Sequence, residues 1–395
     1  MSRSAGRLVK LIAMGRAPLV AVVVAAVLAA VPAGAAAQAP GAPDASALAA
    51  AVGAAYQRHH FGAAIYGVWR DGQEVTVGAV GRSEPGVPAS TDMHFRIGNT
   101  AESFLTTLLV RYAEQGRLRL DDPLSKWMPS FPRSARVTLD MLAHSTSGYA
   151  DYVTSNAFSN AFDADPFHTW TPNEVLSIAK RLKPKFAPGR SWGFSDTNFV
   201  LLAQVLERID GRPIADQFRA EIFDPLGMTQ TSRSQLAPLP SPVLHVHTTE
   251  RGVYEDSTFW SPSFVPGAGD SSSDLRDMGR WAEAMGTGSL LSPASYALQT
   301  GPALAGVGPF TKTEYYGMGL VRFKGWILVN PLINDYSGIV AYHTPTHTAV
   351  VVEATLGKTN PPINAYGTVV FKDLAKLLTP GDVPSLPAAP RKTTR

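Results

Sequence analysis

The sequence predicts an α/β protein of the α+β type, in which an antiparallel sheet is flanked by helices and accompanied by a helical subdomain. Two observations lead to this prediction. Short apolar segments typical of strands occur near both ends of the chain, whereas residues 138–228 have mainly helical periodicity. Strands from the two ends must meet across the helical middle, which favours an antiparallel sheet covered by helices, with a pocket between the two parts.

The first 39 residues have the features of an export signal. Basic residues precede an apolar stretch at 17–31, and Ala35-Ala36-Ala37 and Ala37-Gln38-Ala39 both fit a cleavage site for small residues. An uncleaved membrane anchor is the alternative interpretation of this stretch. We therefore expect a secreted or cell-envelope protein whose contact with the membrane is limited to the signal segment.

The chain is expected to contain one folded domain between two terminal segments. Proline and basic residues at the C-terminal end are typical of a solvated, disordered tail. We predict a signal peptide at 1–39, a single folded domain at 40–379 and the tail at 380–395, with the sheet part at about 40–98 and 265–379 and the helical part at about 99–264.

Local signals place the individual elements. Residues 45–59 form the first helix, and Asp71-Gly72 between two apolar runs is a strong hairpin signal. The helix that follows Asn99 can end at Gly116, because glycine readily adopts the left-handed backbone found at helix C-termini. Asp274, with the serines before it, is expected to cap a further helix. The remaining predictions are strands at 316–323, 326–330, 339–342 and 348–353, and a last helix near 370–378.

The composition limits the kinds of molecule that the chain is expected to bind. The chain has 35 Lys and Arg against 32 Asp and Glu, and four of the basic residues lie in the signal segment. A nearly neutral domain gives no indication of nucleic-acid binding. The absence of cysteine excludes disulfides, catalytic thiols and thiolate metal sites. We expect a monomer with no cofactor and no metal, which binds a small molecule, a peptide or a glycan.

Several short motifs follow one another in order along the chain. Phe95-Arg96-Ile97-Gly98 leads into Asn99-Thr100-Ala101-Glu102, and Ser145-Thr146-Ser147-Gly148, Phe194-Ser195-Asp196 and Pro225-Leu226-Gly227-Met228 follow. Together they resemble the β-lactamase-related, penicillin-binding-protein-like serine hydrolases, whose members include class C β-lactamases, DD-peptidases and esterases. The resemblance covers most of residues 45–378 and implies the β-lactamase/penicillin-binding-protein-like fold. In that family a serine attacks an acyl carbonyl, and a lysine one helical turn later transfers its proton.

All three motifs that carry this chemistry depart from the family pattern. Where the family has Ser-x-x-Lys, this chain has Asn99 and Glu102, and where it has Tyr-x-Asn, the chain has Phe194 and Asp196. The third motif, Lys-Thr-Gly or His-x-Gly, corresponds to Val329-Asn330-Pro331. An amide is a poor nucleophile, and losing nucleophile and base together costs on the order of 10⁶-fold in catalysis. We therefore predict that the chain is not a standard serine acyl hydrolase.

Asn99 and Glu102 have two interpretations. An Asn at the N-cap with Glu three residues later, just before an apolar run, fits a capping box and needs no function. Alternatively, the family fold brings Glu102 and Asp196 to one cleft, where two carboxyls would raise each other's pKa and serve as a general acid and base. Such a pair could also bind a divalent cation through oxygen ligands.

Three functions remain open on these grounds. The first is a ligand-binding pseudoenzyme whose cleft is lined by Asn99, Ser147, Tyr149, Phe194 and Tyr336. The second is a repurposed enzyme, active in small-molecule tailoring or non-covalent hydrolysis, with the carboxyl pair as its catalytic residues. The third is a serine hydrolase, as the family resemblance implies. Whether the chain is an enzyme is therefore left open.

Other reactive side chains have weaker patterns. Ser177 and Lys180 match Ser-x-x-Lys by chance, in a different helix of the family framework. A Ser145–His144 nucleophile would need an orienting acid that the sequence does not place. Two histidine pairs are interpreted as surface or loop residues: His245 with His247, which lack an evident third metal ligand, and His343 with His347, which flank a predicted turn.

Overall fold

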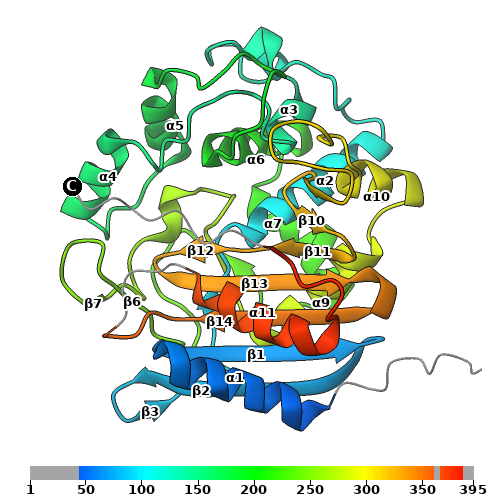
Figure 1. Ribbon diagram of the computed structural model, residues 1–395. Helices are drawn as coiled ribbons and strands as arrows, with labels where there is room; N and C mark the ends of the chain where they lie inside the picture. The colour runs from blue at the N-terminus through cyan, green and yellow to red at the C-terminus, as the bar shows by residue number, and fades with distance from the viewer. Residues whose placement is uncertain (1–43, 360–364, 386–395) are drawn as a thin grey trace, which may run out of the picture. The chain divides into compact units, whose positions relative to one another are not determined.

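The computed structural model describes residues 44–359 and 365–385 (Figure 1). The predicted signal peptide at 1–39 lies outside the described residues, as does most of the predicted tail. Pro43–Arg395 forms one compact unit by its internal contacts. Among the described helices, none combines the length and the apolar character that crossing a membrane would require.

The main sheet confirms the predicted antiparallel architecture. Its strand order is β3-β2-β1-β14-β13-β11-β10-β9, with β12 paired to β13, so strands from both ends of the chain lie side by side. In the central pair, Tyr66 lies opposite Val352. The bounds are β1 Ala63–Arg70, β2 Gln73–Glu84, β3 Val87–Pro88, β9 Glu314–Tyr316, β10 Val321–Phe323, β11 Trp326–Val329, β12 Leu332–Ile333, β13 Tyr336–His343 and β14 Thr348–Ala354.

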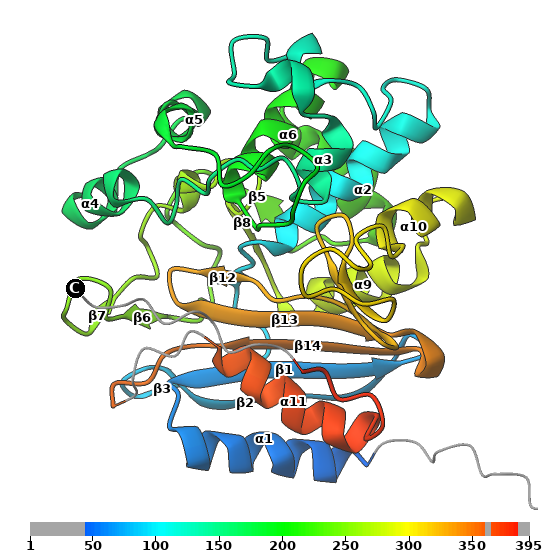
Figure 2. The same cartoon turned by 45° about the horizontal axis from the view of Figure 1, so that its top comes forward.

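Helices cover both faces of this sheet. Helices α1 (Ala45–His59) and α11 (Tyr366–Leu378) pack together on one face (Figures 1 and 2). The buried residues of α1 are Leu48, Val52 and Ala55, whose spacing puts them on one side of the helix. Helix α9 (Leu275–Thr287) packs on the opposite face, against β1, β13 and β14. The sheet therefore has a buried face on each side.

The helical part is built around α2 (Thr100–Glu114), most of whose residues are buried, and α6 (Asp196–Asp210), which packs against it. The other helices of this part are α3 Leu139–Ala143, α4 Asn156–Ala164, α5 Pro172–Arg181, α7 Ile214–Phe218, α8 Asp224–Leu226 and α10 Pro293–Thr300. Two small sheets accompany them: β4 (Phe95–Arg96) with β5 (Ser232–Arg233) and β8 (Ser271–Ser273), and the pair β6 (His247–Thr248) and β7 (Glu255–Asp256).

Most elements that were predicted from local sequence signals are present in the structure. The first helix has the predicted bounds, Asp71 and Gly72 form the hairpin turn with positive φ, and Gly116 follows α2 with φ +69°. The Asp274 side chain caps α9 by accepting a hydrogen bond from the Asp277 N–H. These elements depend on contacts within a few residues, which a sequence displays directly.

Several boundaries differ from the prediction: the last helix begins at Tyr366 instead of near residue 370, and the strand expected at 339–342 spans Tyr336–His343. The single strand expected at 316–323 is divided into β9 and β10 by a turn at Gly317–Leu320. A Cβ atom on Gly319 would lie 2.9 Å from the backbone oxygen of Glu102, so this turn packs closely on α2. In the part of the predicted tail that the structure describes, the Asp382 carboxylate lies 3.1 Å from His343 Nε2 and the Gly381 carbonyl accepts a hydrogen bond from Lys324.

Candidate functional site

The segment before α2 places Asn99 next to the main sheet. Gly98 has φ +40°, and a Cβ atom there would lie 3.1 Å from the Leu332 backbone oxygen and 3.2 Å from Ile333. Only glycine allows this approach without displacing β12. Because Asn330 and Pro331 directly precede β12, the segment predicted as the third motif lies beside the segment predicted as the first.

The Asn99 side chain joins two carboxyl groups. Its Nδ2 atom lies 2.7 Å from Glu102 Oε1 and 3.2 Å from Asp196 Oδ1, and donates a hydrogen bond to each. Asn99 makes no side-chain capping bond to the α2 backbone. The capping-box interpretation is therefore wrong, because the amide is directed at side chains of two helices instead of at backbone N–H groups. Glu102 and Asp196 converge on this amide, as predicted.

Burial dominates the electrostatics of this pair. Glu102 is 2% exposed and Asp196 is 7% exposed. Loss of hydration raises the pKa of both carboxyls well above their usual range, and neighbouring acids raise it further: Asp196 acts on Glu102, and Asp151 acts on both. Within the described part of the chain, neither carboxyl forms an ion pair with a lysine, arginine or histidine. Burial therefore favours the protonated, hydrogen-bonding form of both carboxyls more than it is favoured in an exposed acid.

Asp151 is a third buried acid of this site, and the sequence analysis did not identify it. Its Oδ1 atom accepts a hydrogen bond from the Val153 N–H at 3.1 Å, and it also accepts from the backbone N–H of Asp196. Burial raises its pKa to about 6, partly opposed by those N–H groups and by the Lys185 charge. The only available signal was an acid between two tyrosines, Tyr149-Ala150-Asp151-Tyr152, which does not reveal its distance from Asp196.

Tyr316, from β9, adds a phenol to the same region and was also missed. Burial raises the pKa of its hydroxyl well above the usual range, and the Glu102 and Asp196 charges raise it further. Trp192 contacts Tyr316 and Phe310, with ring centroids 5.4 and 4.9 Å apart. Trp192 and Phe310 are partly exposed whereas Tyr316 is buried, so the two rings form an outer aromatic layer over it.

Three predicted ligand-binding residues have structural partners instead. The Ser147 hydroxyl donates to Asn198 Oδ1 at 2.5 Å, and the Tyr149 hydroxyl donates to the Pro132 carbonyl at 2.6 Å. Tyr336 is 1% exposed and its hydroxyl donates to the Leu244 carbonyl at 2.5 Å. These three positions are buried, and their role in ligand binding stays a prediction. Phe194 is partly exposed and stacks on Phe199.

The weaker candidates do not assemble into a nucleophilic site. The Ser177 hydroxyl donates to the Asn173 carbonyl on exposed helix α5, whose real capping box is Thr171 with Glu174. His144 finds an acid, because its Nδ1 lies 3.1 Å from Asp140 Oδ1. However, its Nε2 has no hydrogen-bond partner among the described residues, so Ser145 is not paired with a base.

The predicted turn histidines lie far from this chemistry. His343 is buried and interacts with Thr346 and Asp382, while His347 lies 3.0 Å from Asp71 across the neighbouring hairpin. Both flank the turn between β13 and β14 as predicted, but His343 is buried at the end of β13, so only His347 is a surface residue.

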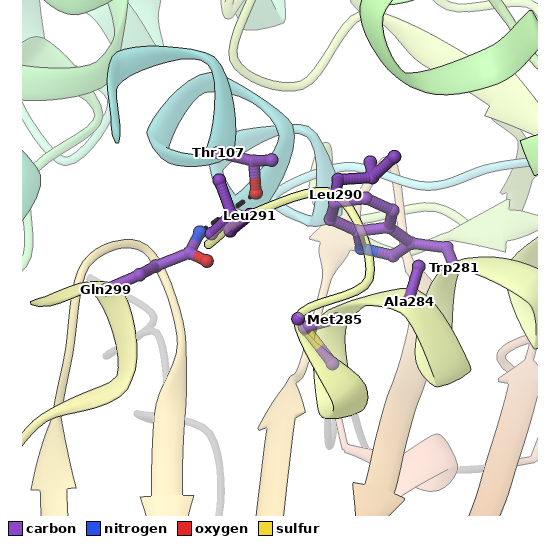
Figure 3. A pocket seen from close by; sticks show the side chains of 8 residues that line it. Thr107, Trp281, Ala284, Met285, Leu290, Leu291 and Gln299 are labelled. Atoms are coloured by element: carbon purple, nitrogen blue, oxygen red, sulfur yellow. Dashed lines mark hydrogen bonds between the residues drawn. The ribbon is translucent and has the colours of Figure 1, made fainter. Parts of the chain in front are cut away.

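Two cavities lie away from the Asn99 site. The first, between α2, α9 and α10, has a volume of about 10 Å³, which suits at most one water molecule. Figure 3 shows that its lining is largely apolar, with Gln299 donating to Thr107 Oγ1 at 2.9 Å. The second has a volume of about 320 Å³ and lies between α1, the end of β2 and the β6–β7 pair. Neither is lined by Asn99, Glu102 or Asp196.

Comparison with known proteins identifies relatives across most of the chain. A family model described as Beta-lactamase matches residues 46–373. Penicillin-binding protein 4* of Bacillus subtilis (strain 168) is 25% identical over 77% of this chain and 70% of its own length. The D-alanyl-D-alanine-carboxypeptidase/endopeptidase AmpH of Escherichia coli (strain K12) is 30% identical over 54% of each chain.

Solved structures match more of the chain. A crystal structure of a D-stereospecific amidohydrolase from Streptomyces sp. is 25% identical, covers 85% of this chain and 98% of its own, and has a TM-score of 0.73. In three of the relatives found by sequence, the match covers between 54% and 70% of the relative's own length. These likenesses confirm the predicted fold class.

Proposed function

The chain belongs to the beta-lactamase family, and from that premise we propose that it is an exported ligand-binding pseudoenzyme of the cell envelope, which does not form an acyl-enzyme. The Asn99 amide between the Glu102 and Asp196 carboxyls carries this proposal. An amide that donates to two carboxyls is held in place as a hydrogen-bond donor. Neither it nor its partners can replace a serine that is activated by a lysine.

The acidic groups of the site favour a ligand that carries an amine. Glu102, Asp196 and Asp151 bring three carboxyls together, and within the described residues none of them forms an ion pair. A ligand carboxylate would add a fourth acid, whereas an ammonium group would gain a charge-assisted hydrogen bond. The names of two similar proteins refer to D-alanyl-D-alanine and to D-stereospecific amide hydrolysis. We therefore infer that a D-amino acid amide or ester with a free amine is the ligand.

Covalent labelling tests the absence of an acyl-enzyme. Wild-type protein is incubated with a fluorescent penicillin and with a fluorophosphonate, and the intact mass is measured. We expect no adduct, because Asn99 cannot be acylated by the serine mechanism. The double variant Asn99→Ser/Glu102→Lys, which recreates the family pattern, serves as the matched comparison and is expected to label above wild type. Stoichiometric labelling of a serine in the wild-type protein would contradict the proposal.

Ligand binding is tested separately. Thermal shift and calorimetric titration compare D-alanine amide, which has a free amine, with its N-acetyl derivative. We expect saturable binding of the amine form only, weakened at least tenfold in Asp196→Asn. Asp224→Asn, which changes an exposed carboxylate on α8, is the control and should bind as wild type does. Equal binding of both compounds would show that the protein does not recognise the free amine.

A second function is favoured by the raised pKa values. A carboxyl whose pKa is raised well above its usual range by burial, near a second carboxyl whose pKa is about 6, is the arrangement of a general acid and base. The chain would then act on a small molecule by proton transfer. Wild type and Glu102→Gln are incubated with an extract of the producing cell and the metabolites are compared. A product that forms only with wild type supports this alternative, and identical profiles count against it.

A further inference from the structure

A second cluster of polar side chains lies outside the family site. Glu84 ends β2, His245 lies just before β6, and Asp256 ends β7. In Figures 1 and 2 the β6–β7 pair lies at the same end of the molecule as β3, the strand that follows the end of β2. Sequence analysis interpreted His245 as a surface residue because no third ligand was evident. The fold supplies two carboxylates, that of Asp256 from the adjacent strand β7 and that of Glu84 from a distant part of the chain.

The distances among these groups are those of a coordination sphere. His245 Nδ1 lies 2.9 Å from Asp256 Oδ2 and 3.6 Å from Glu84 Oε1. One ligand atom from each residue lies within 4.8 Å of the others. Ligand atoms at about 2.1 Å from a tetrahedral Zn²⁺ are about 3.3 Å apart. Small side-chain rotations would therefore be enough to place an ion among the three atoms.

Hydrogen bonds hold the backbone around the cluster in place, which limits the entropy that would be lost when these side chains bind an ion. Buried Ser83 accepts a hydrogen bond from the His245 N–H at 2.8 Å and donates to the Val243 carbonyl at 2.9 Å, so it ties the end of β2 to the segment before β6. Asp256 Oδ1 accepts from the Thr258 N–H at 2.8 Å. That bond fixes the carboxylate and leaves Oδ2 directed at His245.

Access and a free coordination position are also present. The Glu84 and Asp256 side chains are 45% and 41% exposed, whereas His245 is 17% exposed and its ring packs edge-on against Phe259. The cavity of about 320 Å³ is lined by Glu84 and by His247, the next histidine along the strand. A fourth ligand, either water or a group bound in this cavity, can therefore reach the ion.

We propose that Glu84, His245 and Asp256 form a Zn²⁺ site at the rim of this cavity, independent of the proposed function at Asn99. One imidazole nitrogen with two carboxylates suits a borderline metal ion, since Ca²⁺ and Mg²⁺ take oxygen ligands. Three protein ligands leave the fourth position of a tetrahedral zinc open. Binding takes place through neutral His245 Nδ1, so any proton on that nitrogen is released to solvent.

The competing explanation is a surface ion pair between a protonated His245 and the two carboxylates. It predicts no stoichiometric metal binding. The chain provides a matched control, because His347 also lies 3.0 Å from a carboxylate, that of Asp71, but no third ligand of the same kind accompanies it among the described residues. A variant of His347 therefore removes a histidine–carboxylate pair without touching the cluster.

Titration with Zn²⁺ alone tests the proposal on the full chain without a histidine tag. Calorimetry at pH 7 is expected to give one Zn²⁺ per chain, and Co²⁺ is expected to give the visible absorption of a tetrahedral site. His245→Gln and Asp256→Asn should each weaken binding at least tenfold, and His347→Gln should bind as wild type does. Glu84→Gln provides a second, exposed substitution, and circular dichroism verifies that every variant is folded.

Two results would overturn the proposal. One is the absence of stoichiometric Zn²⁺ binding by folded wild-type protein. The other is binding that His245→Gln, Asp256→Asn and Glu84→Gln all leave unchanged, because the ion would then occupy another site. Either result can occur while the ligand test at Asn99 succeeds, so the two proposals fail separately.

Discussion

At the scale of single residues, the acids near Asn99 are unusual for their burial. Carboxyls are seldom fully buried without a partner, because removing their charge from water is costly. Here the Asn99 amide gives Glu102 and Asp196 a shared donor, and Asp151 takes two backbone N–H groups. These hydrogen bonds satisfy the oxygens but do not neutralise charge. Proton uptake is therefore the least costly way for the folded chain to keep three acids together.

The contribution of these three acids to stability is predicted to fall as pH rises. The unfolded chain releases protons from its carboxyls near pH 4, whereas in the folded chain Asp151 titrates at about 6 and the pKa values of Glu102 and Asp196 are also raised. Below about pH 4 both states are protonated and the full stability is present. Above it, the folded state binds more protons than the unfolded state, so the free energy of unfolding decreases up to the folded pKa values.

The variant Glu102→Gln tests the predicted direction in which the free energy of unfolding changes with pH. The variant keeps an oxygen that can accept from Asn99 but cannot ionise, so it should lose less stability than wild type between pH 5 and pH 8. Urea unfolding followed by circular dichroism at the two pH values measures the difference. Asp224→Asn removes an exposed carboxylate and is expected to follow wild type. A steeper loss of stability in Glu102→Gln than in wild type would show that Glu102 is ionised in the folded state.

At the scale of elements, the close packing of α9 on the main sheet depends on glycine. A Cβ atom on Gly286 would lie 2.1 Å from ring atoms of Tyr342 on β13, and one on Gly279 would lie 3.0 Å from the Trp69 ring on β1. Tyr342 is 4% exposed, so its ring has little room to move away. Gly53 in α1 differs, because a Cβ atom there would have no neighbour within 4 Å.

These two helix positions predict opposite effects of one substitution. Gly286→Ala should destabilise the fold by about 2 kcal/mol or more through overpacking. Gly53→Ala should stabilise it by ~0.5–1 kcal/mol, because alanine loses less backbone entropy in a helix. Denaturant midpoints of the two variants against wild type measure both effects. A stable Gly286→Ala protein would mean that α9 can move away from β13 at little cost.

At the scale of the whole molecule, one hydrophobic core joins the sheet to the helical part. The core cluster contains Ile65 and Val351 from the sheet, Phe104 from α2, Phe199 from α6 and Trp281 from α9. Phe104 and Trp281 are in edge-on contact with ring centroids 4.6 Å apart. Separating the two parts would expose these side chains to water, which opposes independent unfolding.

We therefore expect one cooperative unfolding transition. Far-ultraviolet circular dichroism, which follows secondary structure, and tryptophan fluorescence, which follows packing around residues such as Trp281, should give the same urea midpoint. Two separated transitions would indicate that the sheet and helical parts are independent domains in spite of their shared core.

The sequence predicted those features of the fold and site that local chemistry specifies. The first helix, the Asp71-Gly72 turn and the Asp274 cap depend on neighbours within a few residues. The strand boundary that failed depends on a tertiary contact, because the strand predicted at 316–323 is interrupted where Gly319 approaches α2. The contacts of Asp382 with His343 and of the Tyr336 hydroxyl with Leu244 also join distant parts of the chain, so the sequence does not display them.

By itself, the sequence determined the antiparallel sheet with its helices, the family resemblance, and the presence of an amide and an acid where that family has a serine and a lysine. Tertiary structure alone decided that Asn99 holds Glu102 and Asp196 together, that Asp151 and Tyr316 join them, and that Glu84 meets His245. Periodicity and turn chemistry act along the chain. The distance between two side chains from separate elements is set instead by how the core between those elements packs.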